Sequence, residues 1–219
     1  MSSTGGQGQG QSRYLAALWC AAEAGVPLVR ARLAGLLGVT SQTVSDAVAA
    51  LRAAGLVEVD GRELRLTPEG TEMAATIVRR TRLVERLLID ELRLRWADAA
   101  AEVVAWERAM SAQAVEALAE RLGRPTTCPH GNPIPDGGGP VDAGRRLAEL
   151  EAGAEFEVLR VPELIEPPGA MLEFLQSSGV VPGARGRVTS RAGDGTVVVG
   201  LEGGSVALGA DTAAHVRVA

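Results

Sequence analysis

The chain has 219 residues, a length that suits one to three small domains with buried cores. No apolar run approaches the roughly 18 residues that a membrane span needs, and no charged segment precedes a short apolar one, so we expect a cytoplasmic protein without a membrane partner. The formal net charge of −5 argues against indiscriminate nucleic-acid binding, but it allows a specific DNA-binding face.

The first part of the chain predicts a helix-turn-helix. Residues 1–12 are rich in Gly, Gln and Ser, a composition typical of a disordered tail. A first amphipathic helix follows, and a second is predicted from Arg30 to Leu37. The turn at Gly38 leads into a third helix, SQTVSDAVAALRAAG, which Gly55 ends. Two helices joined by a short turn that contains glycine form a helix-turn-helix.

A hairpin completes this part of the chain. The segment LVEVDGRELRLT alternates apolar and polar residues around Asp60-Gly61, a pair that favours a tight turn. Thr67 and Pro68 then open another helix as N-cap and first-turn residue. Together these elements predict a winged helix over residues 13–75. The alternative is a set of helices and a hairpin that serve only packing or dimer contacts.

We favour DNA binding because the third helix begins with short polar side chains that can meet phosphates and base edges. Gln42 can bind adenine through two hydrogen bonds, whereas Asp46 either accepts one from cytosine N4 or repels phosphate. Residues 1–76 hold six arginines and seven acidic residues, so the electrostatic footprint is weak. The predicted DNA-binding residues are Arg30, Arg32, Ser41, Gln42, Thr43, Ser45, Asp46, Arg62 and Arg65.

Further helices are predicted downstream. A long helix begins at Glu69 and carries the run RRTRLVERLL, and a later one carries AAEVVAWERAMS at residues 100–111. Positions 100, 104, 107 and 108 share one face of that later helix, a spacing that can converge on one metal ion. A loop with the sequence CPHGNPIP follows the next amphipathic helix.

These segments resemble the diphtheria toxin repressor family of iron- and manganese-dependent transcriptional regulators, and the CPHGNPIP loop is the most specific single match. The resemblance extends from Tyr14 to the C-terminus. It implies an α+β fold with an N-terminal winged helix-turn-helix, a helical dimerisation domain and a C-terminal SH3-like β-barrel of FeoA type. It also implies a homodimer that binds double-stranded operator DNA. The expected domains are a disordered tail at 1–12, the winged helix at 13–75, a helical dimerisation and degenerate metal-sensing domain at 76–142, a linker at 143–152 and the barrel at 153–219.

Most of the metal ligands that the resemblance implies are replaced. The family carries Met, His, Glu, His, Cys, Glu and His at the positions of Arg13, Thr81, Glu85, Ala100, Val104, Glu107 and Arg108. Apolar side chains do not coordinate a metal, and arginine is a permanent cation that repels one. Glu85 and Glu107 are therefore the remaining candidate ligands for Fe²⁺ or Mn²⁺, the ions that the resemblance implies. Two scattered carboxylates do not make a selective site, so we favour the alternative that both pair with arginines at the surface or in a network.

The loop and the C-terminal segment offer few further ligands. Cys128 and His130 have the spacing of half a metal site, but the chain holds one other cysteine and one other histidine, so we favour a purely structural loop. Short alternating strands with Gly/Asp turns predict a five-stranded barrel with one short helix near 169–178. The resemblance places ancillary ligands near Pro168 and Met171, which suit neither ion, and Glu166 substitutes only if the loop is shifted.

Three hypotheses for the function remain, and none is enzymatic, because neither histidine lies near a catalytic motif. The preferred one is a homodimeric, sequence-specific DNA-binding regulator that is not controlled through the usual metal sites. In this hypothesis Arg108 and Arg13 carry a fixed positive charge in place of the metal ion, and this charge pairs with carboxylates and holds the DNA-binding geometry. Arg108 and Glu107 are then the residues that control DNA binding.

The second hypothesis is a Fe²⁺- or Mn²⁺-dependent repressor with a rearranged, carboxylate-based site. Its candidate ligands are Glu85, Glu102, Glu107 and, in addition, Cys128 or His130. The third hypothesis is a regulator that binds a protein partner or senses a small molecule without binding DNA. The near-neutral winged helix and Asp46 favour this third hypothesis.

Overall fold

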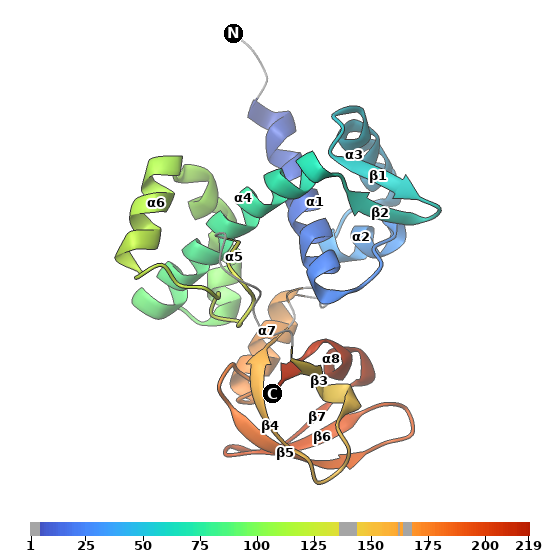
Figure 1. Ribbon diagram of the computed structural model, residues 1–219, viewed down its shortest axis with the longest axis vertical. Coiled ribbons are helices and arrows are strands. Elements are labelled where there is room, and N and C mark those ends of the chain that lie inside the picture. The colour runs from blue at the N-terminus through green and yellow to red at the C-terminus, as the bar shows by residue number, and fades with distance from the viewer. Residues whose placement is uncertain (1–4, 136–143, 162, 164–167) are drawn as a thin grey trace. The chain divides into compact units, whose positions relative to one another are not determined.

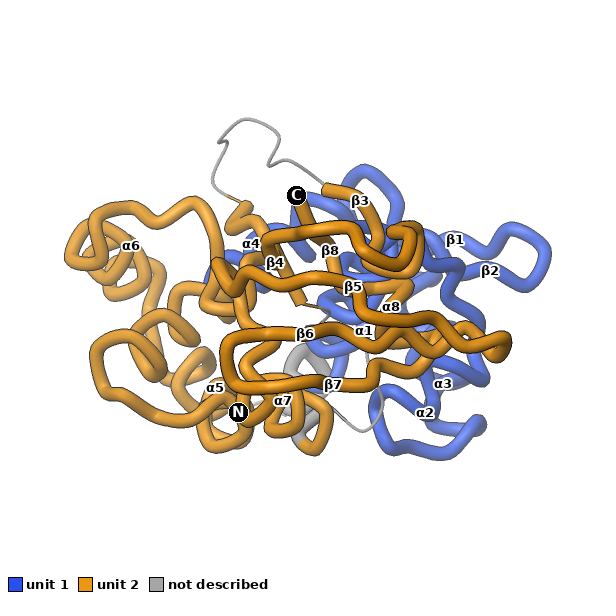
Figure 2. The backbone as a smooth tube through the Cα atoms, turned by 90° about the horizontal axis from the view of Figure 1, so that it is seen from below, with its two compact units in different colours: residues 1–80 blue, residues 81–219 orange. Residues whose placement is uncertain are grey.

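A computed structural model describes residues 5–135, 144–161, 163 and 168–219. It combines helices and sheets, as the sequence predicts, and divides the chain into two compact units, Met1–Arg80 and Thr81–Ala219 (Figures 1 and 2). The division into two units falls within the helix that the sequence predicts from Glu69, and the helical segment shares a unit with the barrel. The predicted bounds of the winged helix, 13–75, stay a prediction. The predicted division of that second unit into separate domains stays a prediction.

The first unit is the predicted winged helix. In chain order it contains α1 (Gly5–Ala24), α2 (Arg30–Leu37), α3 (Ser41–Ala53), β1 (Val57–Asp60), β2 (Glu63–Leu66) and the start of α4 (Pro68–Arg86). Gly38 caps α2 in the left-handed conformation with φ +61°, and the Thr40 hydroxyl accepts a hydrogen bond from the Thr43 amide to cap α3. At the head of α4 the Thr67 hydroxyl accepts from the Gly70 amide at 3.0 Å, the N-cap that the sequence predicts.

The N-terminal tail is the one correction in this unit. Helix α1 begins at Gly5, so residues 5–12, which we expected to be disordered, continue the helix. Extending an existing helix adds one backbone hydrogen bond for each residue that is fixed, and this offsets the poor helix propensity of a glycine-rich segment. The first four residues of the predicted tail lie outside the described residues.

Packing orients α3. Val44, Val48 and Leu51 are fully buried at helical spacing on its inner face. The hairpin β1–β2 is antiparallel, and Asp60 pairs with Glu63 at its tip, where Gly61 has φ +59°. The polar residues of α3 are therefore left on the outer face, free to meet another molecule.

The second unit begins with helices. After α4 come a π-helical turn η1 (Leu87–Glu91), α5 (Trp96–Ala109) and α6 (Ala112–Arg121). The Ser111 hydroxyl caps α6 by accepting from the Ala114 amide. The shared core of these helices consists of Leu83, Val84, Leu88, Ala99, Val103, Val115, Leu118, Ala119 and Ile134.

The rest of the unit is a sheet with two small helices. The strands form a six-stranded sheet in the order β3-β8-β4-β5-β6-β7, all of it antiparallel. The strands are β3 (Arg145–Arg146), β4 (Glu155–Arg160), β5 (Arg185–Arg191), β6 (Val197–Leu201), β7 (Gly204–Leu208) and β8 (Arg217–Val218), with η2 (Leu147–Glu149), α7 (Pro168–Ser177) and α8 (Ala210–His215) between them.

The predictions for this sheet need two corrections. The described part of the chain has six strands, not five, because β3, two residues long and inside the predicted linker, is too short to show an alternating pattern. The predicted linker at 143–152 contributes β3 and η2, since Leu147 and Leu150 are buried in the barrel core. The short helix was predicted correctly, as α7, whereas α8 was expected to be strand.

Trp96 joins the helices to the barrel within the second unit. Its side chain belongs to the barrel core, and its backbone amide donates to Gln176 Oε1 at 3.0 Å. Next to it, Arg95 pairs with Glu173 on α7 at 3.2 Å. The start of α5 is thereby fixed against α7, so side chains from both parts can meet. None of the described helices is long and apolar enough to cross a membrane.

Candidate metal centre and DNA-binding face

The CPHGNPIP loop is a tight turn that holds two side chains in place. The Cys128 amide donates to the Asn132 carbonyl at 2.8 Å, and the Gly131 amide donates to the Cys128 carbonyl at 2.9 Å. Gly131 has φ +84°, and a Cβ at this position would lie 2.1 Å from the carbonyl oxygen of Leu159 on β4. Only glycine fits, because the loop packs directly on that strand.

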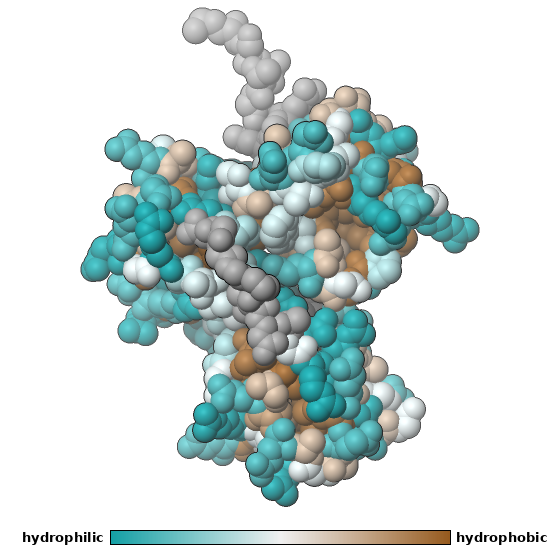
Figure 3. Space-filling view, viewed as in Figure 1, coloured by the Kyte–Doolittle hydropathy of each residue, from teal (hydrophilic) through white to brown (hydrophobic). Residues whose placement is uncertain are grey.

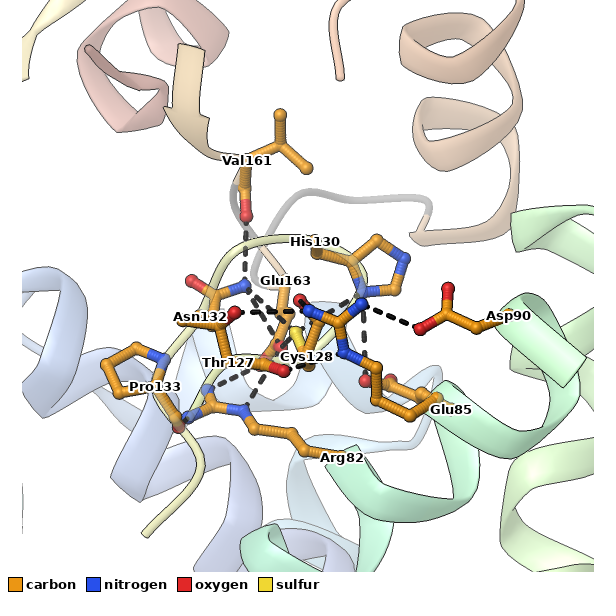
Figure 4. A network of polar contacts seen from close by, with 11 residues as sticks. Arg82, Glu85, Asp90, Thr127, Cys128, His130, Asn132, Pro133, Val161 and Glu163 are labelled. Atoms are coloured by element: carbon orange, nitrogen blue, oxygen red, sulfur yellow. Dashed lines mark hydrogen bonds and ion pairs between the residues drawn. The ribbon is translucent and has the colours of Figure 1, made fainter. Parts of the chain in front are cut away.

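Four side chains from separate segments converge beside this loop (Figure 4). Glu85 comes from α4, Cys128 and His130 from the loop, and Glu163 from the segment that follows β4. One ligand atom from each lies within 4.8 Å of the other three. We call these four residues the Cys128 cluster.

The spacing within the Cys128 cluster suits a bound ion. Cys128 Sγ lies 3.8 Å from His130 Nδ1 and 3.4 Å from Glu163 Oε1. His130 Nδ1 lies 3.7 Å from Glu85 Oε2. Metal–ligand bonds of 2.0–2.3 Å in a tetrahedron place the ligand atoms about 3.3–3.8 Å apart. These three contacts therefore match the edges of a tetrahedral site.

Burial adds a second argument for an ion. Cys128 is fully buried and His130 is 3 % exposed. Glu85 Oε2 and His130 Nε2 are buried and have no hydrogen-bond partner among the described residues. An unsatisfied buried polar atom is costly, more so when it carries charge, and a divalent ion would satisfy the carboxylate oxygen.

The surroundings of Cys128 and His130 shift the pKa values of both side chains. Burial, followed by the charges of Glu163 and Glu85, raises the pKa of the Cys128 thiol well above its ordinary value. Burial lowers the pKa of His130, but the Glu85 and Glu163 carboxylates outweigh it, so this pKa is raised. A metal ion must displace the thiol proton in order to bind.

A surrounding set of hydrogen bonds holds the Cys128 cluster in place. Arg82 is buried, and its guanidinium donates to both carboxylate oxygens of Glu163 at 3.3 and 2.9 Å and also to the Pro133 carbonyl. The Asn132 amide donates to Glu163 Oε1 at 3.0 Å and to the Val161 carbonyl at 3.1 Å. Such second contacts orient the groups that bind a metal.

The donor set and the charge both fit a divalent transition metal. One sulfur, one imidazole nitrogen and two carboxylate oxygens suit Fe²⁺ or Zn²⁺, and a thiolate ligand is less suited to Mn²⁺. With the thiol and imidazole deprotonated, two carboxylates and one thiolate balance a divalent ion together with the Arg82 cation. The residues present therefore fit a resident metal ion.

The face of α5 that carries positions 100, 104, 107 and 108 has no comparable arrangement. Val104 is 47 % exposed, and Ala100 packs against the barrel core. Arg108 is exposed and has no ion pair among the described residues. Glu107 is half-buried and is not a member of the Cys128 cluster, so the two candidate ligands of the sequence, Glu85 and Glu107, are not brought together. The switch role of Arg108 stays a prediction.

The remaining replaced positions are equally unsuited to a metal. Arg13 is exposed, and its guanidinium lies 5.1 Å from the ring centroid of its neighbour Tyr14. Thr81 offers a hydroxyl that is a poor ligand for Fe²⁺ or Mn²⁺. Glu102 is exposed and lies outside the Cys128 cluster.

Glu163 is the candidate metal ligand that the sequence does not predict. We placed ancillary ligands near Pro168 and Met171 and considered Glu166, but Met171 packs against the barrel core and Glu166 lies outside the described residues. We also favoured a purely structural loop, since we sought the partners of Cys128 among cysteines and histidines. The structure supplies carboxylates instead. The available signal is an acidic residue three positions after the end of a strand with alternating buried residues.

The predicted DNA-binding residues lie in the first unit. Ser41, Gln42, Thr43, Ser45 and Asp46 are all exposed on the outer face of α3. Gln42 Nε2 donates to Asp46 Oδ1 at 2.9 Å.

The arginines expected to contact phosphate differ in their exposure and in their ion pairs. Arg62 is exposed at the tip of the hairpin, whereas Arg30 and Arg32 on α2 are half-buried. Arg65 pairs with Glu63 at 2.8 Å and with Asp60 at 3.2 Å, so much of its charge is already neutralised. Hydrophilic side chains cover this hairpin tip in Figure 3. Arg62 is therefore the best-placed phosphate contact of the wing.

The same figure shows hydrophobic surface between α1 and β2. It coincides with a hollow of about 480 Å³ lined by Leu18, Trp19, Leu64, Leu66 and neighbouring residues. A small apolar ligand of the kind that our third hypothesis requires has room there. That hypothesis stays a prediction.

Comparisons with known proteins agree with this arrangement. Residues 67–136 match the family model described as iron dependent repressor, metal binding and dimerisation domain. Residues 145–219 match the FeoA domain, and residues 12–69 match the Crp-like helix-turn-helix domain. These matches cover the winged helix, the helical segment and the barrel in order.

Individual relatives are similar along most of their length. The chain is 38% identical to the iron-dependent repressor IdeR of Mycobacterium tuberculosis over 198 residues, 85% of this chain and 86% of the relative. It is 34% identical to the diphtheria toxin repressor of Corynebacterium efficiens over 215 residues, 94% and 93% of the two chains. Among solved structures, a manganese-dependent transcriptional repressor in complex with manganese is 31% identical with a TM-score of 0.82, covering 95% of this chain and 98% of its own.

Proposed function

The chain belongs to the iron-dependent repressor family, and on this premise we propose that it is a homodimeric DNA-binding transcriptional regulator that responds to a divalent metal ion through the Cys128 cluster. The convergence of Glu85, Cys128, His130 and Glu163 is the observation that carries this proposal. The relatives are repressors rather than enzymes, which agrees with our expectation of a non-enzymatic protein.

DNA binding is supported by the winged helix itself. Its third helix exposes polar side chains at the positions where such helices enter the major groove. Arg62 on the hairpin is free to contact phosphate. Homodimerisation is supported by the description of the matched family model and by the partly exposed Val104 and Trp106 on α5, apolar side chains that a second copy would cover.

Metal control through the usual positions has no support in the side chains. The four sensor positions on α5 hold Ala, Val, Glu and Arg, which cannot form a selective site. The Cys128 cluster holds four donors in tetrahedral spacing. A bound ion would tie α4, the loop and the segment after β4 together, and it would thereby restrain these parts of the second unit. This proposal adopts the rearranged metal site of the second hypothesis, with a different set of partners.

The test is metal-dependent DNA binding. Protein stripped with EDTA and protein reloaded with Fe²⁺, Mn²⁺ or Zn²⁺ are compared on genomic fragments selected at low salt. We expect the stripped protein to bind weakly and Fe²⁺ to restore binding, and we expect Cys128→Ser to remain weak at every ion concentration. Glu107→Gln is the matched control, since it removes a carboxylate outside the Cys128 cluster.

The metal-independent hypothesis makes the opposite prediction. If Arg108 supplies a permanent charge in place of an ion, DNA binding is the same with and without EDTA, and Arg108→Ala abolishes it. These two results together would show that Arg108, and not the Cys128 cluster, controls DNA binding. Less than about one tight metal equivalent per chain, measured by elemental analysis, would count against the metal proposal as well.

A further inference from the structure

One hydrogen bond on the outer face of α3 fixes the orientation of the Gln42 side chain. Gln42 and Asp46 are four residues apart, one helical turn, and Gln42 Nε2 donates to Asp46 Oδ1 at 2.9 Å. Both side chains are exposed. A free glutamine amide can turn either end outward, but this hydrogen bond places the nitrogen toward Asp46 and leaves the oxygen free.

The contact leaves each residue with a defined hydrogen-bonding capacity. Gln42 retains Oε1 as an acceptor and the second Nε2 hydrogen as a donor, the pair that matches N6 and N7 of adenine. Asp46 retains Oδ2, a carboxylate oxygen, which accepts hydrogen bonds. In the major groove the cytosine N4 amino group is the donor that suits an acidic side chain.

Three neighbouring hydroxyls on the same face are already engaged. Ser45 Oγ donates to the Ser41 carbonyl at 2.9 Å. The hydroxyls of Thr40 and Thr43 share a hydrogen bond of 2.8 Å, and Thr40 Oγ1 also accepts from the Thr43 amide. Gln42 and Asp46, with the Ser41 hydroxyl beside them, therefore keep hydrogen-bonding atoms free for bases.

We propose that Gln42 and Asp46 read two neighbouring base pairs as one unit, adenine through Gln42 and cytosine through Asp46. Cβ atoms one turn apart are about 5–6 Å from each other, a span that covers two bases stacked about 3.4 Å apart. Asp46 is then a specificity-determining residue rather than a repulsive one. This inference rests on the proposed DNA-binding function, and it defines the base preference of that same face.

The test is selection from random DNA duplexes with the full chain, in the presence of Fe²⁺, for the native protein and for Asp46→Asn. The substitution keeps the size of the side chain and an oxygen that can accept from Gln42, but it replaces the free acceptor by a donor. We expect one cytosine position in the selected motif to change to a base with a major-groove acceptor. Affinity for the original site should fall about tenfold, the usual effect of one mismatched base pair.

Two further variants complete the experiment. Gln42→Ala should lose the adenine preference and weaken the cytosine preference beside it, because the two side chains are coupled. Glu58→Gln on β1 is the matched charge control: it removes one negative charge from an exposed side chain that belongs to the hairpin and not to α3. We expect it to leave the motif unchanged.

The possible results distinguish a wrong base preference of α3 from a protein that does not bind DNA. If Asp46→Asn selects the same motif and binds all sequences more tightly, as Glu58→Gln would, then Asp46 only repels phosphate and the inference is wrong. If the native protein enriches no sequence at all, the proposed DNA-binding function fails, and the inference fails with it. A native motif with adenine and cytosine at neighbouring pairs, changed by both α3 variants, supports the proposal.

Discussion

The sensor face of α5 and the Cys128 cluster both lie in the second unit, and they differ in what they offer a metal ion. On α5 the four positions are carried by one helix, and alanine, valine and arginine stand at three of them. The Cys128 cluster takes its donors from α4, the loop and the segment after β4. Each of these segments contributes at most two ligands.

Replacing the ligands on one element therefore does not by itself remove every place where an ion can bind. The sensor positions of α5 lose this capacity because three of their four side chains are not donors for a metal. A site assembled from several segments is supported by the packing of all of them. Here Arg82 and Asn132 hold Glu163, while Gly131 holds the loop against β4.

The largest expected effect is on stability, from Arg82→Met. The substitution removes the donors to both Glu163 oxygens and leaves a partly buried carboxylate without its cation. We expect the free energy of unfolding, measured with denaturant, to fall by about 3–5 kcal/mol. Arg108→Met on the exposed face of α5 is the control, with an expected change within about 0.5 kcal/mol. If both variants lowered the free energy of unfolding equally, the Cys128 cluster would be no better supported by packing than the exposed face of α5.

Cys128→Ser tests metal affinity. Serine has nearly the same shape, but its hydroxyl is a much weaker ligand than a thiolate for a transition metal. We expect calorimetric titration with Fe²⁺ or Zn²⁺ to show an affinity at least about 100-fold lower, since changes in supporting residues alone cost 10- to 100-fold. Val104→Ala on α5 should leave the affinity unchanged. An equal loss in both variants would place the ion on α5 after all.

Gly131→Ala tests the close approach of the loop to β4. The new Cβ would lie 2.1 Å from the Leu159 carbonyl oxygen, and φ is +84°. Gly123→Ala is the control, because its φ is +75° but nothing lies within 4 Å of a Cβ there. Positive φ alone costs about 1 kcal/mol in both, so we expect Gly131→Ala to lower the unfolding free energy by at least about 1 kcal/mol more. Similar losses would show that the loop can move away from β4.

The smallest expected effect is that of Arg108→Ala on DNA binding. Arg108 is exposed and has no ion pair among the described residues, so its removal should change the affinity for selected DNA by less than about twofold. A mobility-shift titration in the presence of Fe²⁺ measures this. A loss of tenfold or more would favour the fixed-charge hypothesis for the sensor face.

Local patterns in the sequence predicted most of the fold. The glycines at 38 and 61, the caps at Thr40 and Thr67 and the apolar spacing of α3 each act within a few residues, so the winged helix could be predicted. Strand β3 could not be predicted because two residues show no periodicity. It forms because β8, which is distant in the chain, supplies its pairing partner.

The candidate site also has features that the sequence predicts and features that it does not. The loss of donors on α5 and the polar start of α3 can be read from the sequence, because each feature belongs to a single helix. The approach of Glu163 to Cys128, 35 residues away, and of Glu85 to His130 depends on tertiary packing. Packing of the loop on β4 creates that meeting, and no short-range pattern encodes it.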